Sequence, residues 1–327
     1  LSSSEADVTE QIHRSPLVTF ALLHYNQQDF VERAMESALA QDYSPLEIIV
    51  SDDCSTDATW DVIQKVAGDY KGRHQLRILR NQSNMGIGPH VGKVGMMASG
   101  DLVVQADGDD VSYPHRVSSL VREWARHGFA SGALHSAVLR RSDGSDPGSL
   151  VHSPASDPRK ASLDYFVKNH FRALMNGASI AYTKDVFTEF PPIDSDFEDI
   201  PLTLRALLLG KLMYVNEPLV EYCSSDGSVS RPLRRSDKQR VIEWFMTIER
   251  NIAFMEQDYL YHAKQNSMSM NPAVAKEFRS VKKKCRTAVD LASSSPIKLI
   301  KAMTSYPYDV PIKQRVAFHL AFFGLLR

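Results

Sequence analysis

The sequence predicts an α/β protein, and two observations carry this prediction. Short apolar segments of strand length alternate with helical patterns over the first hundred residues, and acidic residues cluster directly after two of these segments. Such alternation implies a parallel sheet whose strands are joined by right-handed crossovers. Ligands of these sheets bind at the carboxyl ends of the strands, so the acidic clusters mark a candidate binding site.

The expected elements follow from local patterns. Buried strands are predicted from continuous apolar segments at 17–23, 46–50, 76–79 and 102–106. Apolar residues at helical spacing predict a helix at 30–40, and the side-chain oxygens of 55–57 suit the start of a second helix at 59–66. A third helix is expected at 89–98, because proline is favoured in a first turn and Pro89 stands there.

After residue 231 the pattern changes to long helices, which are expected at 236–264, 271–292, 297–304 and 311–326. An apolar stripe runs along the first of them, formed by Val241, Trp244, Phe245, Ile248 and Ile252. The opening residues are polar and acidic. The sequence therefore predicts a flexible segment at 1–15, an α/β domain at 16–230 and a helical region at 231–327.

Composition excludes several classes of protein. Of the 327 residues 43% are hydrophobic and 24% charged, a balance that rules out a disordered or collagen-like chain. The net charge of −1 argues against a general nucleic-acid binder. Cys54, Cys223 and Cys285 are widely spaced and encode neither a disulfide framework nor a zinc finger. Because neither a signal peptide nor a membrane-spanning segment is visible, we expect a cytoplasmic location, and contact with the inner face of a membrane stays open.

The two acidic clusters stand at equivalent strand ends. Asp52 and Asp53 follow the second predicted strand, and Asp107, Asp109 and Asp110 follow the fourth. Carboxylates that repel one another in one crevice are costly unless a cation or hydrogen-bond donors offset them, and Asp-Gly-Asp spacing suits Mg²⁺ or Mn²⁺. Helix capping and turn formation are the alternative use of these residues.

A series of motifs in a fixed order makes the sequence resemble family 2 glycosyltransferases. These motifs are Tyr25-Asn26, Ser37 to Gln41, Glu47 to Asp57, Asn84 to Gly86, and Gly100 to Asp110 with Pro114 and Arg116. The resemblance covers 16–230 and implies the GT-A fold, in which a nucleotide-binding half at 16–115 precedes an acceptor-binding half at 116–230 around one mixed sheet. It further implies inverting transfer from a nucleotide sugar to an acceptor hydroxyl, in polysaccharide, lipopolysaccharide or glycoprotein assembly.

The resemblance also implies which residues bind the donor. Leu23 and Tyr25 would flank the base, and Asp53 would accept a hydrogen bond from a uracil or thymine ring, so that the donor is a UDP- or dTDP-linked sugar. Asp52 would support the turn, and Lys93 would approach the diphosphate.

The segment Asp107-Gly108-Asp109 matches the D-x-D motif of the family. By that resemblance Asp109 is the direct ligand of Mn²⁺ or Mg²⁺, Asp107 reaches the ribose or the metal, and Gly108 belongs to the nucleotide-binding turn. Asp110 is an extra carboxylate, for which capping of the following turn is the expected role.

An acidic pair farther along supplies the expected base. Residues 197–205 resemble the E-D motif of the family, which opens a helix whose N-terminal dipole favours carboxylates. Asp199 is the expected general base, and Glu198 is expected to bind acceptor hydroxyls or to support Asp199. Asn176 and Gly177, before a strand-like segment at 179–182, occupy the place where the family contacts the acceptor sugar.

One segment departs from the family pattern. Many relatives carry basic residues after the last core strand, whereas 222–230 contain none, so the donor and the metal dependence are less firmly implied than the fold. Cys223 in this segment is expected to serve packing.

The sequence argues against two other classes of nucleotide-binding enzyme. An NAD-type oxidoreductase needs a glycine-rich turn after its first strand, but residues 24–28 contain no glycine, and a sugar-phosphate nucleotidyltransferase would need a similar loop. A catalytically silent nucleotide-sugar-binding or scaffold module of the same fold stays open as the alternative.

The net charge hides two opposed parts. Residues 1–227 carry a net −11, whereas 228–327 carry +10. The basic helices are expected to contact an anionic membrane surface, an anionic glycan or lipid-linked acceptor, the acidic part of the chain, or a second copy in a homodimer.

Overall fold

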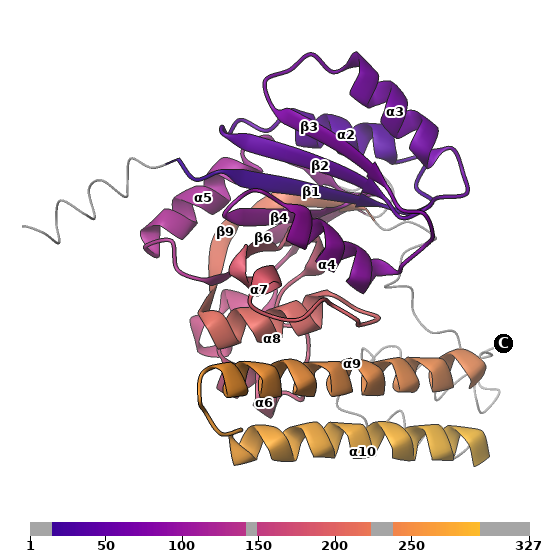
Figure 1. Ribbon diagram of the computed structural model, residues 1–327, viewed down its shortest axis with the longest axis vertical. Helices are drawn as coiled ribbons and strands as arrows, with labels where there is room; N and C mark the ends of the chain where they lie inside the picture. The colour runs from indigo at the N-terminus through magenta and orange to yellow at the C-terminus, as the bar shows by residue number, and fades with distance from the viewer. Residues whose placement is uncertain (1–14, 142–148, 224–237, 295–327) are drawn as a thin grey trace, which may run out of the picture. The chain divides into compact units, whose positions relative to one another are not determined.

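A computed structural model of the chain describes residues 15–141, 149–223 and 238–294 (Figure 1). These residues divide into two compact units. One unit, called here the sheet unit, ends at Ser162 and resumes at Ala173, and the other, the helical unit, comprises 163–172 and the described residues after 226.

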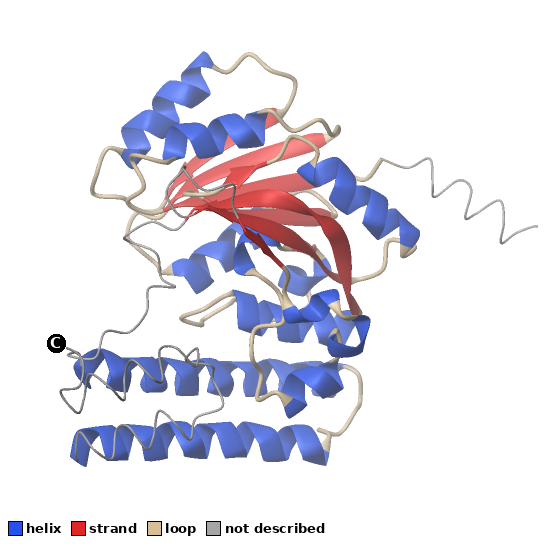
Figure 2. Cartoon of the chain, turned by 180° about the vertical axis from the view of Figure 1, so that it is seen from behind, coloured by secondary structure: helices blue, strands red, loops and turns tan. Residues whose placement is uncertain are grey.

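A nine-stranded mixed sheet is the centre of the sheet unit (Figure 2). The strand order is β3-β2-β1-β4-β8-β6-β9-β5, and β7 pairs with β6 outside this path. The strands are β1 Val18–His24, β2 Leu46–Asp52, β3 Gln75–Arg80, β4 Leu102–Asp107, β5 Val111–Ser112, β6 Gly132–Arg141, β7 Ser149–Val151, β8 Ala181–Thr183 and β9 Lys211–Cys223.

The first four strands are parallel, and β8 changes the direction of the sheet. β1 pairs in parallel with β2 and β4, and β3 adds to β2 in the same direction. β4 and β6 both pair with β8 in antiparallel fashion, whereas β6 and β9 are parallel. The α/β class with a mixed sheet, predicted from the sequence, is therefore confirmed.

Longer helices cover this sheet, and short ones connect its strands. In the sheet unit they are α2 Val31–Leu39, α3 Thr59–Asp69, α4 Ile87–Met97, α5 Arg116–Arg126, α7 Asp185–Thr188 and α8 Asp199–Leu209. Three of them confirm the helices expected at 30–40, 59–66 and 89–98. The strand expected from residue 179 begins at Ala181, because residues 177–179 form a 3₁₀ turn in which the Ser179 amide donates to the Asn176 carbonyl at 2.9 Å.

Alternation along the strands separates an apolar face from a face that carries polar groups. Phe20, Leu22 and Val104 belong to the main hydrophobic core. Their neighbours project to the other face, because successive side chains of a strand point to opposite sides. Leu23 is paired with Ser51 on one side and with Asp107 on the other, so these three residues lie next to one another at the carboxyl end of the sheet.

The amino end of the sheet is held by a buried carboxylate. Glu47 accepts hydrogen bonds from the Thr19 hydroxyl at 2.6 Å and the Ser99 amide at 2.9 Å. Arg77 on β3 forms an ion pair with the same carboxylate at 2.8 Å. Glu47 thus joins three neighbouring strands and the loop that leads into β4.

The helical unit consists of α6 Leu163–Lys168, α9 Lys238–Gln265 and α10 Pro272–Ser294. The two long helices confirm those expected at 236–264 and 271–292, whereas 297–304 and 311–326 lie outside the described residues. Phe278 of α10 stacks on Phe171 with ring centroids 4.4 Å apart. No helix in the described part of the chain is both long enough and apolar enough to cross a membrane.

Part of the apolar stripe predicted on the first long helix, α9, is buried. Phe245, Ile248 and Ile252 are buried. Ion pairs of Lys282 with Glu256 and of Arg286 with Glu249 connect α10 to α9.

Candidate active site

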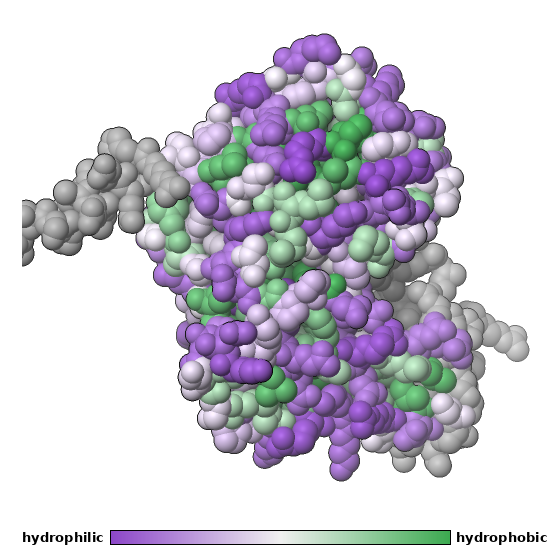
Figure 3. All heavy atoms as spheres, in the orientation of Figure 1, coloured by the Kyte–Doolittle hydropathy of each residue, from purple (hydrophilic) through white to green (hydrophobic). Residues whose placement is uncertain are grey.

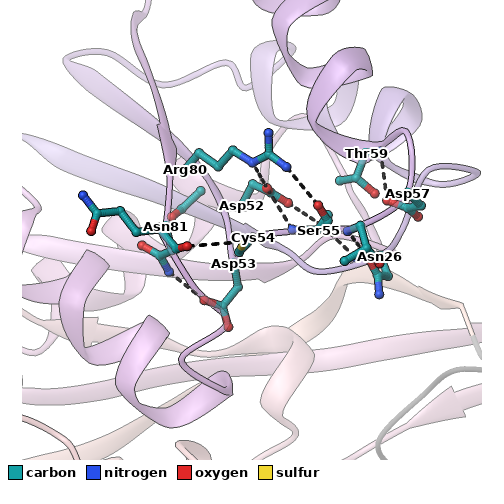
Figure 4. A network of polar contacts seen from close by, with 12 residues as sticks. Asn26, Asp52, Asp53, Cys54, Ser55, Asp57, Thr59, Arg80 and Asn81 are labelled. Atoms are coloured by element: carbon teal, nitrogen blue, oxygen red, sulfur yellow. Dashed lines mark hydrogen bonds and ion pairs between the residues drawn. The ribbon is translucent and has the colours of Figure 1, made fainter.

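Two loops at the carboxyl end of the sheet are bound to each other (Figure 4). The Asn26 amide donates to the Ser55 hydroxyl at 2.9 Å, and the Asn26 side-chain oxygen accepts from the Thr56 amide at 2.8 Å. Asn26 has a φ of 51°, a left-handed conformation that asparagine adopts more readily than most residues. The loop after β1 is therefore fixed on the loop after β2.

Asp52 is a fully buried part of this framework. Its carboxylate forms an ion pair with Arg80 at 3.2 Å and accepts hydrogen bonds from the amide and the hydroxyl of Ser55. Asp52 therefore connects the loop after β2 to β3.

Asp53 points to a different loop. Its carboxylate accepts from the Asn81 side chain at 2.7 Å and from the amides of Met85 and Gly86, each at 3.0 Å. Lys93 on α4 donates to the side-chain oxygen of the same Asn81 at 2.6 Å. The structure thus places Lys93 beside Asp53, in a chain of contacts that fixes the loop before α4.

Leu23 and Tyr25, predicted at the base, differ in exposure. Leu23 is 4% exposed on the sheet, whereas Tyr25 in the following loop is 46% exposed. An exposed aromatic ring beside a buried apolar side chain is suited to stack on a planar ligand.

The D-x-D turn, Asp107-Gly108-Asp109, packs against the end of β1 and the loop that follows it. A Cβ atom on Gly108 would stand 2.0 Å from His24 Nδ1 and 2.3 Å from the side-chain oxygen of Gln27, so a larger residue would have to displace these side chains. Asp107 and Asp109 flank Gly108 and are half-buried. Asp110 is buried, and one of its oxygens accepts from the Cys223 amide at 2.9 Å, which connects the turn to the end of β9.

The carboxylates of Asp107, Asp109 and Asp110 lie close enough in this turn to repel one another when ionised. Burial and the neighbouring Asp109 raise the pKa of Asp107, and burial and Asp107 raise the pKa of Asp110. Arg116 partly offsets this charge from a fully buried position, where it donates to the Ser112 hydroxyl at 2.9 Å and the Gln105 carbonyl at 2.6 Å. The second oxygen of Asp110 has no hydrogen-bond partner among the described residues.

These residues fit a divalent cation that is completed by a ligand. Within the described ranges no three His, Cys, Asp or Glu side chains are grouped to hold a metal by themselves. Mg²⁺ and similar ions in nucleotide sites commonly take one or two carboxylates and complete their shell with phosphate oxygens and water. Asp107 and Asp109 supply such a pair, and a cation between them would relieve the repulsion that raises the pKa of Asp107.

The second acidic pair lies at the start of α8. Glu198 precedes the helix and Asp199 is its first residue, with the Asp199 carboxylate accepting from the Ile200 amide at 2.8 Å. The buried side chain of Gln105 on β4 donates to Glu198 Oε1 at 3.2 Å. Gly177 lies next to the same carboxylate. Among the described residues, the one atom within 4 Å of a Cβ built on Gly177 is Glu198 Oε1, at 4.0 Å.

The two acidic groups also affect each other's ionisation. Burial, Asp199 and Asp107 together raise the pKa of Glu198. Asp199 also contributes to the raised pKa of Asp107, although it is 92 residues farther along the chain. Burial raises the pKa of Asp199 itself. By geometry, Glu198 lies next to Gln105 of β4 and to Gly177, and Asn176, which precedes Gly177, is half-buried.

Three residues of this site were not predicted from the sequence. Asn81 organises Asp53, Gln105 contacts Glu198, and Tyr182 on β8 lies within the field of the acidic groups. The Tyr182 hydroxyl is buried without a hydrogen-bond partner in the described residues, and burial followed by Asp199 raises its pKa. A polar residue inside an apolar strand was the available signal for Gln105.

Cys223 closes the described part of β9. Its thiol accepts a hydrogen bond from Arg33 at 3.0 Å, so it takes part in a polar contact as well as in packing. The remainder of the atypical segment, 224–230, lies outside the described residues.

The fold and the two acidic segments define a class of protein: an α/β protein with the GT-A fold that the resemblance implies, with one acidic turn after β4 and a second acidic pair at the start of α8. Residues 19–138 match the model of the family described as Glycosyl transferase family 2. Over this part the chain is similar to family 2 glycosyltransferases, and the resemblance recognised in the sequence is confirmed.

Individual proteins similar to this chain agree with that assignment. The succinoglycan biosynthesis protein ExoO of Rhizobium meliloti is 28% identical over 236 residues, which are 68% of this chain and 65% of ExoO. Other curated relatives match over less of their length, and the chain spans 41% of one and 56% of another.

Two solved structures have the same fold. A crystal structure of S. aureus TarS residues 1–349 in complex with UDP-GlcNAc has a TM-score of 0.54 at 17% identity, covering 94% of this chain and 88% of that one. The mannosyltransferase PcManGT from Pyrobaculum calidifontis, in complex with GDP-Man and Mn²⁺, has a TM-score of 0.54 at 16% identity, covering 98% and 87%.

Proposed function

We propose that the protein is a metal-dependent inverting glycosyltransferase, which moves a sugar from a UDP- or dTDP-linked donor to an acceptor hydroxyl. The observation that carries the proposal is the contact between the strand of the D-x-D turn and the start of α8, where Gln105 of β4 donates to Glu198 at 3.2 Å. Together with burial, Asp199 raises the pKa of Asp107, and both raise the pKa of Glu198. A donor phosphate bound through a metal ion and an acceptor hydroxyl both need acidic partners, and in this proposal the two sets of carboxylates serve one site.

On the donor side, Leu23 and Tyr25 flank the base, and Asp53 accepts from its ring nitrogen. The fixed geometry of Asp53 supports this role, because three donors hold its carboxylate at the end of β2. Lys93 donates to Asn81, which also contacts Asp53. From this position the ammonium group of Lys93 would attract the negatively charged diphosphate. TarS is known in complex with UDP-GlcNAc and PcManGT in complex with GDP-Man, so the choice of a UDP- or dTDP-linked donor rests on the family resemblance.

Asp109 and Asp107 are the residues that would hold Mn²⁺ or Mg²⁺, and Gly108 lets the turn approach the donor. A bound divalent cation neutralises the charge that develops on the leaving nucleoside diphosphate. PcManGT, which has a similar fold, binds GDP-Man together with Mn²⁺. Arg116 holds the turn in place from below through its hydrogen bond to the Gln105 carbonyl.

On the acceptor side, Asp199 removes the proton from the attacking hydroxyl. Its pKa is raised by burial, which suits a general base, since proton transfer is most effective when the pKa of the base is close to the working pH. Glu198 orients the acceptor, and Asn176 and Gly177 line the place of the acceptor sugar. Attack from the side opposite to the leaving diphosphate inverts the configuration in a single displacement.

The biological role that we propose is the assembly of a cell-surface polysaccharide. ExoO, a relative over 68% of this chain, is a succinoglycan biosynthesis protein. The acceptor would then be a growing glycan or a lipid-linked precursor.

The test is a donor screen with the full chain. Thermal unfolding is measured with UDP-glucose, UDP-GlcNAc, dTDP-glucose and GDP-mannose, with and without Mn²⁺, and donor hydrolysis is followed by release of the nucleoside diphosphate. We expect one donor to raise the melting temperature only when Mn²⁺ is present. In the Asp109→Asn variant, the same donor and Mn²⁺ together should no longer raise the melting temperature. Binding without any turnover would favour the catalytically silent module, and no stabilisation by any donor would contradict the proposal.

We further propose that the helical unit contacts an anionic membrane surface. Lys276, Arg279, Lys283 and Arg286 are exposed at spacings of three and four on α10, which places them along one side of the helix. On the face drawn in Figure 3, the helical unit presents hydrophilic residues with hydrophobic ones among them. Each Lys or Arg near an anionic leaflet contributes roughly 1 kcal/mol.

Vesicle binding tests this contact. We expect the full chain to bind vesicles with 30% phosphatidylglycerol, to be released by salt, and not to bind neutral vesicles. The double variant Lys276→Glu/Lys283→Glu should lose binding, whereas Lys65→Glu/Lys71→Glu in the sheet unit should retain it. A concentration-dependent dimer without vesicle binding would instead assign the basic helices to self-association.

A further inference from the structure

Gln105 is a buried amide in a strand that is otherwise apolar. It is 2% exposed, and its neighbours in β4 are Val103, Val104 and Ala106. Its backbone is fixed on both sides, because its amide donates to the Ile180 carbonyl at 3.1 Å and its carbonyl accepts from Arg116 at 2.6 Å. The side chain therefore leaves a rigid point of the sheet.

The Gln105 side chain connects β4 to the acceptor-side carboxylates. It donates to Glu198 Oε1 at 3.2 Å. Asp107 lies two residues farther along β4, and therefore on the same face of the sheet as Gln105. Gln105 thus ties Glu198 to the strand that ends at the D-x-D turn.

Stability alone does not explain an amide at this place. Gln105 Oε1 is buried and has no hydrogen-bond partner among the described residues, and such an atom destabilises a fold relative to an apolar side chain. A lysine or arginine at this place would bring a positive charge that competes with a bound cation. A neutral donor holds Glu198 without adding such a charge.

We propose that Gln105 is a positioning residue that holds Glu198 against β4, the strand that ends at the D-x-D turn, and thereby aligns the acceptor hydroxyl with the donor. The inference rests on the proposed glycosyl transfer. Gln105 acts through Glu198 and does not itself take part in proton transfer or metal binding. Its removal should therefore reduce turnover while donor binding and folding persist.

The test compares Gln105→Met, which keeps the length of the side chain but not its hydrogen bonds, with Gln64→Met, a matched change at an exposed position of α3. Affinity for UDP in the presence of Mn²⁺ is measured by calorimetry, folding by thermal unfolding, and turnover by UDP release from the donor that the wild type hydrolyses fastest. A shorter amide, Gln105→Asn, serves as the second variant.

For Gln105→Met we expect a melting temperature within about 2 °C of the wild type, UDP affinity within threefold, and kcat at least tenfold lower, since small misplacements of reacting groups cost large factors in rate. Gln105→Asn should give an intermediate kcat, and Gln64→Met should match the wild type.

Turnover of Gln105→Met within twofold of the wild type would overturn the inference and leave the proposed function intact. A parallel loss of UDP affinity would also overturn it, because Gln105 would then belong to the donor site. Unfolding of both Gln105 variants would assign the residue to stability instead. A wild type that binds no nucleotide and hydrolyses no donor would overturn the proposed function, and this inference with it.

Discussion

A Cβ atom on Gly88 would stand 1.9 Å from the carbonyl oxygen of Ser195, so the start of α4 and the segment before α8 pack backbone against backbone. Ser195 precedes Glu198 by only three residues. The same side of α4 carries Gly95, where a Cβ atom would stand 2.3 Å from the ring of Phe187. α4 therefore supports the chain that leads into the acceptor-side carboxylates.

Gly88→Ala should push this segment away from α4. Because the contact is with backbone, it cannot be relieved by a rotamer change, and we expect a loss of about 1–3 kcal/mol in the free energy of unfolding. Displacement of Glu198 and Asp199 should also lower turnover by at least about tenfold. Urea unfolding and diphosphate release from the donor measure the two effects.

Gly68→Ala is the matched control, since no atom lies within 4 Å of its Cβ position near the end of α3. It should stabilise the protein by up to about 1 kcal/mol and leave turnover unchanged. If Gly88→Ala behaved in the same way, the supporting role of α4 would be wrong.

The opposite end of α4 is held by Lys184. Its ammonium group donates to the carbonyls of Gly95, Met96 and Ala98 at 2.8, 2.9 and 2.6 Å, which satisfies carbonyls that a helix leaves free at its last turn. Lys184→Met should cost about 1.5–3 kcal/mol of stability, as expected for hydrogen bonds to a charged group. Urea unfolding provides the measurement.

Lys65→Met provides the comparison for this prediction, because the single ion pair of exposed Lys65 within the described residues is with Glu32, at 3.7 Å. Exposed pairs contribute between about 0 and 1 kcal/mol. Equal losses in the two variants would show that the three carbonyl contacts of Lys184 contribute nothing specific.

Asp199→Asn tests the base. The amide keeps the shape of the carboxylate but cannot accept the hydroxyl proton, so we expect turnover to fall by a factor of about 10² to 10⁴. UDP affinity in the presence of Mn²⁺ should change by less than about threefold. Exposed Asp194→Asn, in the same segment, controls for a general loss of charge and should retain activity. Retained turnover in Asp199→Asn would remove Asp199 from the role of base.

Sequence patterns predicted the first half of the fold better than the second. β2 and β4 begin at Leu46 and Leu102, as expected, because each is a continuous apolar segment whose burial is decided locally. β6 was not predicted. It contains His135, which is buried by contacts from distant parts of the chain, including the Ser153 hydroxyl at 3.0 Å.

In the site, too, local motifs were predictable and contacts between distant segments were not. Asp107 and Asp199 were recognised from local motifs, but the bridge from Gln105 to Glu198 joins residues 93 positions apart. A local pattern contains no information about such a contact. Only the pairing of β4 with β8, and the packing of the segment before α8, bring these residues together.

Glu47 makes the stability of the sheet depend on pH. Burial opposes its ionisation, but hydrogen bonds from Thr19, Ser99 and Arg77 outweigh burial and hold the pKa of Glu47 below its ordinary value. A carboxyl group whose pKa is lower in the folded state stabilises the protein above the pKa of the unfolded chain, and that contribution is lost as the pH falls through the folded value. The stabilisation is therefore complete at pH 7 and declines below about pH 4.

Glu47→Gln should remove this contribution. Loss of one partner of a buried ion pair leaves Arg77 without its charge partner, and we expect a cost of about 3 kcal/mol at pH 7. In urea unfolding from pH 7 to pH 3, the difference between the wild type and Glu47→Gln should narrow as Glu47 becomes protonated. Exposed Glu32→Gln should show almost no difference at any pH. If the difference in the free energy of unfolding between the wild type and Glu47→Gln stayed constant down to pH 3, the stabilisation would not come from the ionised carboxylate of Glu47.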